Sequence, residues 1–247
     1  MYHPEETIRS RQNALLARVR AVRAGREPGW IVLEGERLVA DALAGGLDID
    51  VLLLAEGRAV PGALAALAPR TRRVEPEVLA SVSALESSPG CLALAPVPAV
   101  RRLPQAGPRA LLAVVAGVQD PGNFGAIARV AEAAGASGLV RVGGAQPFGD
   151  KALRGSMGSL LRLPVYGQLE PHELAAKGYR LVAAATRGGA DPRRFDWSGP
   201  VALWIPGEAG GDAPAGADAV TLPMAGHVES LNVAVAAALL LYAAGRV

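Results

Sequence analysis

Two uninterrupted apolar runs constrain the fold more than any other feature of this chain. Residues 110–116 read Ala-Leu-Leu-Ala-Val-Val-Ala, and residues 201–205 read Val-Ala-Leu-Trp-Ile. Each run has the length of a strand, and neither shows the apolar–polar alternation of a strand with one face in water. Strands that are buried on both faces have this pattern, and they belong to parallel sheets covered by helices. The runs therefore predict an α/β fold with a mostly parallel sheet.

The sequence around these runs supplies the other elements that such a sheet needs. We expect helices over residues 124–134, 150–161, 171–177 and 230–244, and further strands over 138–142, 180–185 and 220–222. Three loops follow strands directly, and they span residues 117–125, 207–211 and 222–232. Ligands of parallel sheets bind at the carboxyl ends of the strands, so we expect the three loops to meet at one edge.

The first part of the chain has an α/β pattern of its own. Strands are expected over residues 30–33, 51–54 and 91–95, and helices over 5–24, from the turn at 34–37 to 44, over 61–67 and over 76–84. Four prolines then fall within residues 96–109, where neither a helix interior nor a central strand accepts them. We therefore predict a domain at 1–98, a linker at 99–109 and a second domain at 110–247.

The first predicted helix is strongly basic. Six arginines and no acidic residue lie between residues 9 and 26: Arg9, Arg11, Arg18, Arg20, Arg23 and Arg26. Like charges on one helix repel unless a partner or a polyanion compensates them. Two interpretations stay open here, a solvated helix face and a face that binds phosphate.

Several classes of function are excluded by motifs that the chain lacks. Its single cysteine, Cys91, rules out an internal disulfide framework, and its histidines, His3, His172 and His227, are too scattered for a metal pair. The loop at 117–125 has the wrong glycine spacing for a Rossmann fingerprint, and neither G-K-[ST] nor G-x-S-x-G occurs. The longest apolar run, 231–244, is too short to span a membrane, so we expect a soluble cytoplasmic protein. The loops suit a cofactor with an adenine, a ribose and an amino-acid tail better than they suit a cofactor with a pyrophosphate.

Four stretches of the second half resemble the SpoU branch (TrmH-like) of the SPOUT methyltransferases. The first motif corresponds to Asp120-Pro-Gly-Asn-Phe-Gly-Ala-Ile-Ala-Arg129, and the second to Ile205-Pro-Gly-Glu-Ala-Gly210. The third corresponds to Leu222-Pro-Met224 with Ser230-Leu-Asn-Val-Ala-Val-Ala236, and residues 156–165 match a further family stretch. The resemblance covers essentially all of 110–247. Residues 8–55 resemble, more loosely, the small substrate-binding domain of the same enzymes.

The resemblance implies a cofactor, a reaction and an architecture. The cofactor is S-adenosyl-L-methionine, and the reaction is methyl transfer to a ribose 2′-hydroxyl of RNA, with ribosomal RNA favoured by the two-domain arrangement. The C-terminal segment is implied to form a deep trefoil knot, which departs from the general rule against threaded chains. The family also forms homodimers whose active site is completed across the interface.

The same resemblance assigns roles to individual residues. Cofactor binding is implied for Thr186, Gly207, Leu222, Met224, Ser230 and Leu231, and catalysis for Arg129, Asn123, Glu208, Ser230 and Asn232. A guanidinium is effectively never neutral, so we expect Arg129 to stabilise the forming alkoxide or to hold a phosphate rather than to act as a base. Glu208 orients either a loop or the ribose. Ser230 has helix capping as an alternative role, and His227 is expected to face solvent.

Four other functions remain open. A tRNA methyltransferase and an antibiotic-resistance methylase would differ from the favoured reading only in the target nucleotide. An RNA-binding protein of the same fold without catalysis is opposed by the presence of the polar motif residues. A nucleotide-dependent oxidoreductase with an unusual turn is opposed by the missing glycine fingerprint.

Overall fold

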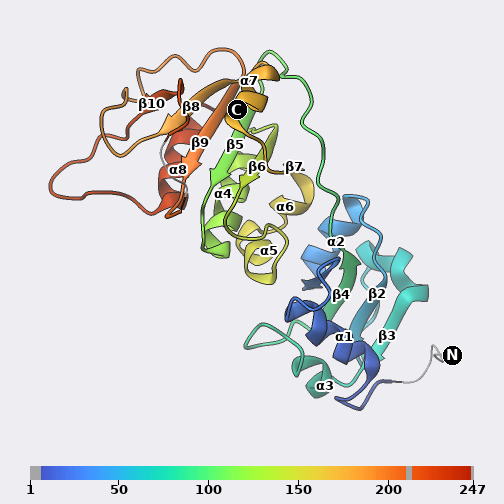
Figure 1. Ribbon diagram of the computed structural model, residues 1–247. Helices are drawn as coiled ribbons and strands as arrows, with labels where there is room; N and C mark the ends of the chain where they lie inside the picture. Colours follow the sequence, from blue (N-terminus) through green and yellow to red (C-terminus); the bar gives the residue numbers. More distant parts are fainter. Residues whose placement is uncertain (1–6, 210–212, 246–247) are drawn as a thin grey trace. The chain divides into compact units, whose positions relative to one another are not determined.

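The computed structural model describes residues 7–209 and 213–245, and its contacts divide the chain into two compact units (Figure 1). The first unit contains the residues up to Pro98 together with residues 148–150. The second unit contains residues 99–147 and the residues from Lys151 onward. The segment that we predicted as a linker belongs by its contacts to the second unit.

The first unit is built on a mixed four-stranded sheet. Its strands are β1 (Trp30–Glu34), β2 (Val51–Ala55), β3 (Thr71–Val74) and β4 (Cys91–Pro96), in the order β1-β4-β2-β3. β4 is antiparallel to β1 and β2, and β3 is parallel to β2. The helices are α1 (Ala14–Arg23), α2 (Glu36–Ala44), the 3₁₀ helix η1 (Gly62–Arg70) and α3 (Pro76–Ala80). The sequence prediction missed β3, because this four-residue edge strand has two adjacent arginines at its centre and Val74 as its one apolar residue.

The predicted helix at 5–24 was too long. Helix α1 begins at Ala14, after Asn13 caps it by accepting a hydrogen bond from the Leu15 N–H at 2.9 Å. Ile8 instead lies in an extended segment that bridges to Val74 of β3. Residues 5 and 6 of the prediction lie outside the described residues. The spacing of apolar residues continued past the true start of the helix, and only the cap marks it.

Acidic residues of neighbouring segments neutralise part of the positive charge of the basic segment at residues 9–26. Arg9 pairs with Glu56 at 2.9 Å, and Arg18 pairs with Asp50 at 2.6 Å and with Glu27 at 3.2 Å. The Arg18 guanidinium also lies 3.9 Å from the centre of the Trp30 ring. Half of the six arginines, with Arg23 as the third, therefore form ion pairs inside the unit. These pairs weaken the argument that the helix needs a polyanion.

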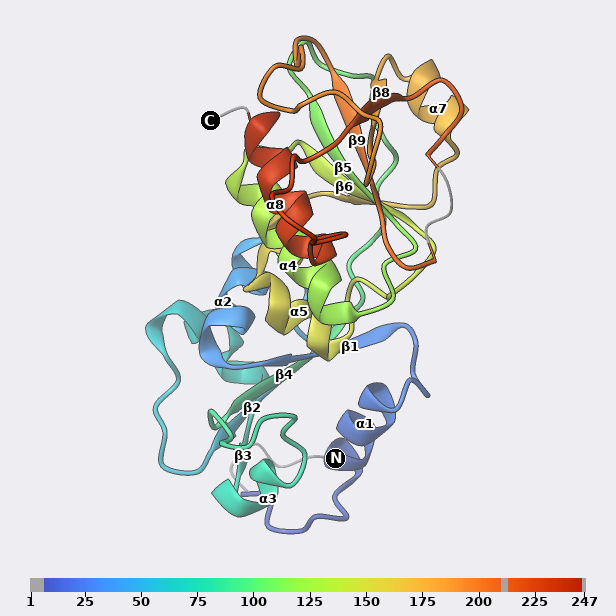
Figure 2. The ribbon, with the colours of Figure 1, turned by 90° about the vertical axis from the view of Figure 1, so that its left-hand side faces the viewer.

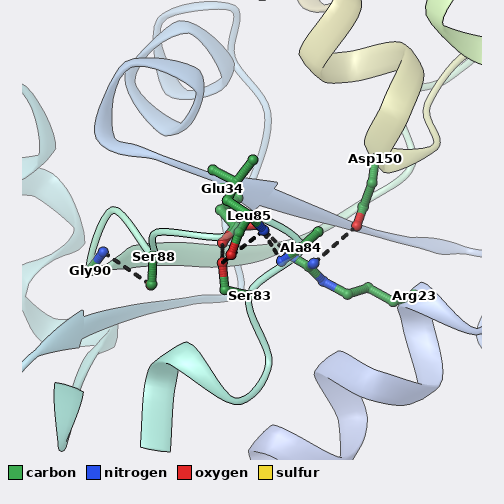
Figure 3. A network of polar contacts seen from close by, with 8 residues as sticks. All are labelled: Arg23, Glu34, Ser83, Ala84, Leu85, Ser88, Gly90 and Asp150. Carbon is green, nitrogen blue, oxygen red and sulfur yellow. Dashed lines mark hydrogen bonds and ion pairs between the residues drawn. The ribbon is translucent and has the colours of Figure 1, made fainter. Parts of the chain in front are cut away.

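A buried carboxylate joins three segments of the first unit (Figure 3). Glu34 at the end of β1 pairs with Arg23 of α1 at 2.6 Å, and its side chain is 5% exposed. It also accepts hydrogen bonds from the Ser83 hydroxyl and from the Ala84 N–H. Burial alone would raise the pKa of this carboxyl, but the bonds from Arg23, Ser83 and Ala84 outweigh it and hold the pKa below its ordinary value. Glu34 thus fixes the 81–90 segment to α1 and β1.

The second unit confirms the predicted α/β fold with a parallel sheet. Its strands are β5 (Leu111–Ala116), β6 (Gly138–Val142), β7 (Val165–Tyr166), β8 (Arg180–Ala184), β9 (Val201–Pro206) and β10 (Asp218–Val220). Their order is β10-β8-β9-β5-β6-β7, and every pairing between these strands is parallel. The two apolar runs form β5 and β9, which are neighbours in the interior of the sheet. Every residue of β5 is buried, as expected for a strand covered on both faces.

Helices and the 99–109 segment cover the two faces of this sheet. Helices α4 (Pro121–Ala133) and α8 (Val233–Ala243) pack side by side on one face (Figure 2). The opposite face carries an apolar cluster that includes Leu103 and, from α7 (Pro171–Ala176), Leu174. Arg101 forms a parallel bridge to Tyr166, so the predicted linker extends the sheet edge. None of the helices that the structure describes is long and apolar enough to cross a membrane.

The predicted helix at 150–161 is two helices. Helix α5 (Asp150–Ser156) ends before Met157 and Gly158, which have φ values of +49° and +85°. Helix α6 (Ser159–Arg162) then starts in a new direction. Two successive residues with positive φ cannot continue a right-handed helix. Apolar spacing did not reveal this break, because it runs through both helices.

Candidate active site

A cavity of about 360 Å³ lies at the carboxyl edge of the second sheet. It is bounded by the ends of β8, β9 and β10, by the loop at 222–232 and by the inner side of α8. Its lining residues are Asn123, Ala184, Ala185, Thr186, Ile205, Pro206, Gly207, Glu208, Val220, Leu222, Met224, Ser230, Leu231, Asn232, Val233, Ala236 and Leu240. The expectation that the three loops meet at one edge is confirmed. Its volume lies in the range of about 300–1,000 Å³ that is typical of small-molecule sites.

The structure brings nine of the ten predicted site residues to this cavity. They are Asn123, Thr186, Gly207, Glu208, Leu222, Met224, Ser230, Leu231 and Asn232. Arg129 is the exception: it is exposed on α4 and does not line the cavity. Gly210 of the second motif lies outside the described residues. The shared location supports the choice of residues, and their individual roles stay predictions.

The second loop is tied to the first by close main-chain packing. The Gly207 N–H donates to the carbonyl oxygen of Ala116 at 2.7 Å, and the Ala209 N–H donates to that of Gly117 at 3.2 Å. A Cβ atom on Gly207 would lie 2.5 Å from the Cα atom of Val118, closer than real Cβ contacts come. Only glycine therefore lets the end of β9 approach the turn after β5 this closely.

Glu208 acts on the same pair of loops. Its carboxylate accepts a hydrogen bond from the Gln119 N–H at 3.2 Å, across the gap between the second loop and the first. Of the two roles left open for Glu208, orientation of a loop is thus the one visible in the structure. Glu208 is also the one ionisable side chain among the cavity-lining residues of the described chain.

The last helix is capped by Asn232 and not by Ser230. The Asn232 side-chain oxygen accepts hydrogen bonds from the N–H groups of Ala234 at 2.9 Å and Val235 at 3.3 Å. Its amide nitrogen donates to the side-chain oxygen of Asn123 at 3.3 Å. The capping alternative for Ser230 was therefore wrong. One amide both starts α8 and links it to the first turn of α4.

Asp120 and Lys151 fix the first turn of α4. Asp120 caps this helix by accepting a hydrogen bond from the Asn123 N–H at 2.8 Å, and the Lys151 ammonium pairs with its other carboxylate oxygen. The hydrogen bond from Lys151, with the one from the Asn123 main chain, lowers the pKa of Asp120. The carboxylate thus stays ionised at neutral pH and holds the backbone that carries the Asn123 side chain.

The third loop offers main-chain groups to a ligand. The N–H groups of Leu222, Met224 and Leu231 donate no hydrogen bond to any residue that the structure describes. All three residues line the cavity, so these N–H groups are open to a ligand that enters it. His227 is exposed, as predicted, and His3 lies outside the described residues. No cluster of potential metal ligands occurs among the described residues.

Sequence reasoning missed the apolar part of the lining. Ala184 ends β8 and Ala185 follows it, Pro206 ends β9, and Ala236 and Leu240 come from one side of α8. The residues at the strand ends directly precede the predicted loops, so adjacency to the motifs was a usable signal. Ala236 ends the third motif, but Leu240 gave no signal, because this helix is apolar on every side and its pattern does not show which face meets a cavity.

Fold and cavity together define an α/β protein that binds a small organic cofactor at the carboxyl edge of a parallel sheet. Residues 110–242 match the model of the SpoU rRNA Methylase family. The chain belongs to this family.

Relatives and solved structures agree over nearly the whole chain. The chain is 32% identical over 224 residues to the 23S rRNA (guanosine(2553)-2′-O)-methyltransferase RlmP of Bacillus subtilis (strain 168), which covers 85% of this chain and 86% of the relative. An AdoMet-bound rRNA methyltransferase from Sinorhizobium meliloti superimposes with a TM-score of 0.83 at 27% identity, over 97% of both chains. The SpoU methyltransferase AviRb from Streptomyces viridochromogenes, in complex with AdoMet, gives 0.79 at 28% identity, over 94% of this chain and 97% of AviRb.

The two contacts of Asn232 can be separated by one substitution. Asn232→Asp keeps an oxygen that caps α8, and its negative charge interacts favourably with the helix dipole. The substitution removes the amide group that donates a hydrogen bond to Asn123. We expect a melting temperature within about 2 °C of wild type, which is under about 1 kcal/mol, together with a methyl-transfer rate at least roughly tenfold lower. Asn232→Ala, which removes both contacts, should also lower stability by about 1 kcal/mol. Wild-type activity in Asn232→Asp would show that the Asn123 contact has no role in catalysis.

Proposed function

We propose that this protein uses S-adenosylmethionine to methylate a ribose 2′-hydroxyl of RNA, and that the RNA is ribosomal. The cavity carries the proposal, because it unites apolar walls, free main-chain donors and the polar motif residues at one sheet edge. The relatives, which include a 23S rRNA 2′-O-methyltransferase, favour ribosomal RNA over tRNA as the substrate. A ribosomal substrate also implies a cytoplasmic site of action.

The lining fits this cofactor in its chemistry. Leu222, Met224 and Leu231 offer N–H groups beside apolar side chains, which suits an adenine edge and its flat faces. Glu208 places one negative charge at a site for a ligand that carries a sulfonium and an ammonium. S-adenosylmethionine supplies an activated methyl group when bound. The protein's own task is to align the 2′-oxygen with that methyl group and to manage its proton.

Asn123 and Asn232 are proposed to hold the 2′-oxygen, and Arg129 to stabilise its charge. The first two residues line the cavity and contact each other. Arg129 lies exposed on α4, outside the cavity of its own subunit. A homodimer in which a partner completes each active site would bring the arginine of a second copy to the cavity that Asn123 and Asn232 line.

The surface of α8 supports self-association. Val235, Leu239 and Tyr242 follow one another at helical spacing and are 49%, 49% and 58% exposed. Such an apolar stripe on a helix favours a protein partner over water. A second copy of this chain is the proposed occupant, and the small residues between these side chains allow close packing. A monomer in light scattering at micromolar concentration would contradict this proposal.

Two further features are proposed from the resemblance. The C-terminal segment that carries the loop at 222–232 and α8 is inferred to form the trefoil knot of the family. The first unit is inferred to bind the RNA substrate. The candidates for phosphate contacts are the arginines of the basic segment 9–26 that have no acidic partner among the described residues, Arg11, Arg20 and Arg26.

Comparison of ribosomal RNA from cells with and without the gene tests the proposed function. We expect one 2′-O-methylated nucleotide to disappear in the deletion strain and to return on incubation with the protein and S-adenosylmethionine. In calorimetry the protein should bind S-adenosylmethionine and not NAD, which discriminates against an oxidoreductase. Unchanged ribose methylation in both ribosomal RNA and tRNA would overturn the enzymatic assignment and leave a non-catalytic RNA-binding protein.

Replacement of Arg129 distinguishes its possible roles. If it acts as a plain positive charge, Arg129→Lys should retain activity within about tenfold, because the charge persists although the planar fork is lost. Arg129→Gln should lower the methyl-transfer rate by roughly 100-fold or more, which is the typical loss of an electrostatic contact in a transition state. Both variants should bind S-adenosylmethionine as wild type does, because Arg129 does not line the cavity. Full activity of Arg129→Gln would exclude a catalytic role.

A further inference from the structure

Arg141 holds a loop that does not line the cavity. It lies in β6, and its Nε donates to the carbonyl oxygen of Ala145 at 2.9 Å while its Nη2 donates to that of Gly144 at 2.9 Å. No acidic side chain pairs with Arg141 in the part of the chain that the structure describes. The planar fork of this arginine therefore serves two consecutive main-chain carbonyls, a geometry that a single ammonium does not reproduce.

The loop at 143–145 presses on the turn that follows β5. The Ala145 N–H donates to the carbonyl oxygen of Val118 at 2.8 Å. Gly144 has φ +69°, and a Cβ atom there would lie 2.4 Å from that same oxygen. Gly143 also has positive φ, but a Cβ atom there would meet no atom within 4 Å, so the close approach to Val118 is made by Gly144. Among the described residues, Arg141 is the side chain that fixes the carbonyl groups of Gly144 and Ala145.

Val118 connects the 143–145 loop to the wall of the cavity. It is 1% exposed, and its main chain touches Gly144 on one side and Gly207 on the other. The next residue, Gln119, donates its N–H to Glu208. Gly207 and Glu208 both line the cavity. The turn at 117–119 is therefore held between two loops, one fixed by Arg141 and the other part of the proposed cofactor site.

We infer that Arg141 is a positioning residue for the cofactor site, acting through the 143–145 loop and Val118 on Gly207 and Glu208. The inference rests on the proposed function for the identity of the cofactor. In the absence of the fork, Gly144 and Ala145 gain freedom, the turn at 117–119 loses its support, and the wall formed by residues 207 and 208 is no longer held in place. Interiors transmit such changes because they are closely packed.

Calorimetry with S-adenosylmethionine on Arg141→Gln and Arg141→Lys tests this role. We expect both variants to bind roughly tenfold more weakly than wild type, since neither side chain offers the fork. Arg162→Gln is the matched control, because Arg162 is an exposed arginine of the same unit that bonds to Glu132 away from the cavity. It should leave the affinity unchanged. Wild-type affinity in Arg141→Gln would overturn the inference.

A double-mutant cycle with Glu208→Ala separates positioning from general destabilisation. If Arg141 acts through the turn that bonds Glu208, the double variant should bind little more weakly than Glu208→Ala alone, because both changes release the same contact. If the fold-losses of affinity in the two single variants multiply in the double variant, Arg141 does not act through Glu208, and this part of the inference is wrong.

Amide hydrogen exchange without any cofactor keeps the inference distinct from the proposed function. Arg141→Gln should raise exchange at residues 117–119 and 207–209 relative to wild type, and Arg162→Gln should not. If the wild-type protein failed to bind S-adenosylmethionine, the proposed function would fail, but this measurement would still decide whether Arg141 holds the two loops. Unchanged exchange at both segments would refute it.

Discussion

Replacing Gly207 by alanine is expected to weaken the binding of S-adenosylmethionine roughly 10- to 100-fold. A Cβ atom on this residue would lie 2.5 Å from the Cα atom and 2.6 Å from the nitrogen of Val118. Both contacts are with main chain, which cannot rotate away as a side chain would. The hydrogen bond from the Gly207 N–H to Ala116 restrains the other side of the residue. The strain must therefore move the wall of the cavity.

Calorimetry measures this change, and Gly107→Ala is its control. Gly107 lies in the same unit, and a Cβ atom there would meet no atom within 4 Å. The control should bind S-adenosylmethionine with wild-type affinity and melt at the wild-type temperature. If Gly207→Ala bound equally well, the close contact between the end of β9 and Val118 would not be a feature of the cofactor-binding state.

Replacing Glu34 by glutamine should lower the stability of the first unit by about 2–3 kcal/mol, the usual contribution of hydrogen bonds to a charged group. The change removes one of the two carboxylates that pair with the Arg23 guanidinium and leaves Asp150, 3.3 Å away, as the other. It also weakens the bonds that hold Ser83 and Ala84 (Figure 3). Urea denaturation followed by hydrogen exchange at residues 30–34 and 81–90 should show the loss in this unit.

The pH dependence of this ion pair has a defined sign. The pKa of Glu34 is lowered in the folded state, so its contribution is complete above the ordinary glutamate value of 4.5 and is lost as the pH falls through the lower folded value. Wild type should therefore lose stability faster than Glu34→Gln on acidification, and the two should converge at low pH. Glu86→Gln, an exposed change in the same segment, should match wild type at every pH. A constant difference between wild type and Glu34→Gln would contradict the assignment.

Sequence periodicity predicted the elements that depend on burial. The apolar runs at 110–116 and 201–205 form two adjacent strands in the interior of the sheet, since a strand between two helical layers has no solvent-exposed face. Elements whose limits depend on single hydrogen bonds or on φ angles were placed less well. The start of α1 at Ala14 depends on Asn13, and the break before α6 depends on Met157 and Gly158. The strand at 71–74 was missed, because edge strands accept charged residues.

The candidate site divides in the same way. Polar and glycine residues in loops after strands could be chosen from the sequence, with the family resemblance, because their chemistry is visible in each residue. Whether a residue lies in the cavity depends on contacts between distant segments, as the position of Arg129 outside it shows. The capping of α8 by Asn232 in place of Ser230 is a choice between two suitable side chains two residues apart, and only backbone geometry decides it.

The sequence by itself determined a parallel α/β layer, the three loops and, through resemblance, the family to which the chain belongs. These features follow from the order of residues, because burial and turn formation depend on residues that are close together in the sequence. The tertiary structure alone decided that Val118 stands between Gly144 and Gly207, and that Asn232 reaches Asn123. Such contacts join residues far apart in the chain, and their existence depends on distances of a few ångströms that no local pattern encodes.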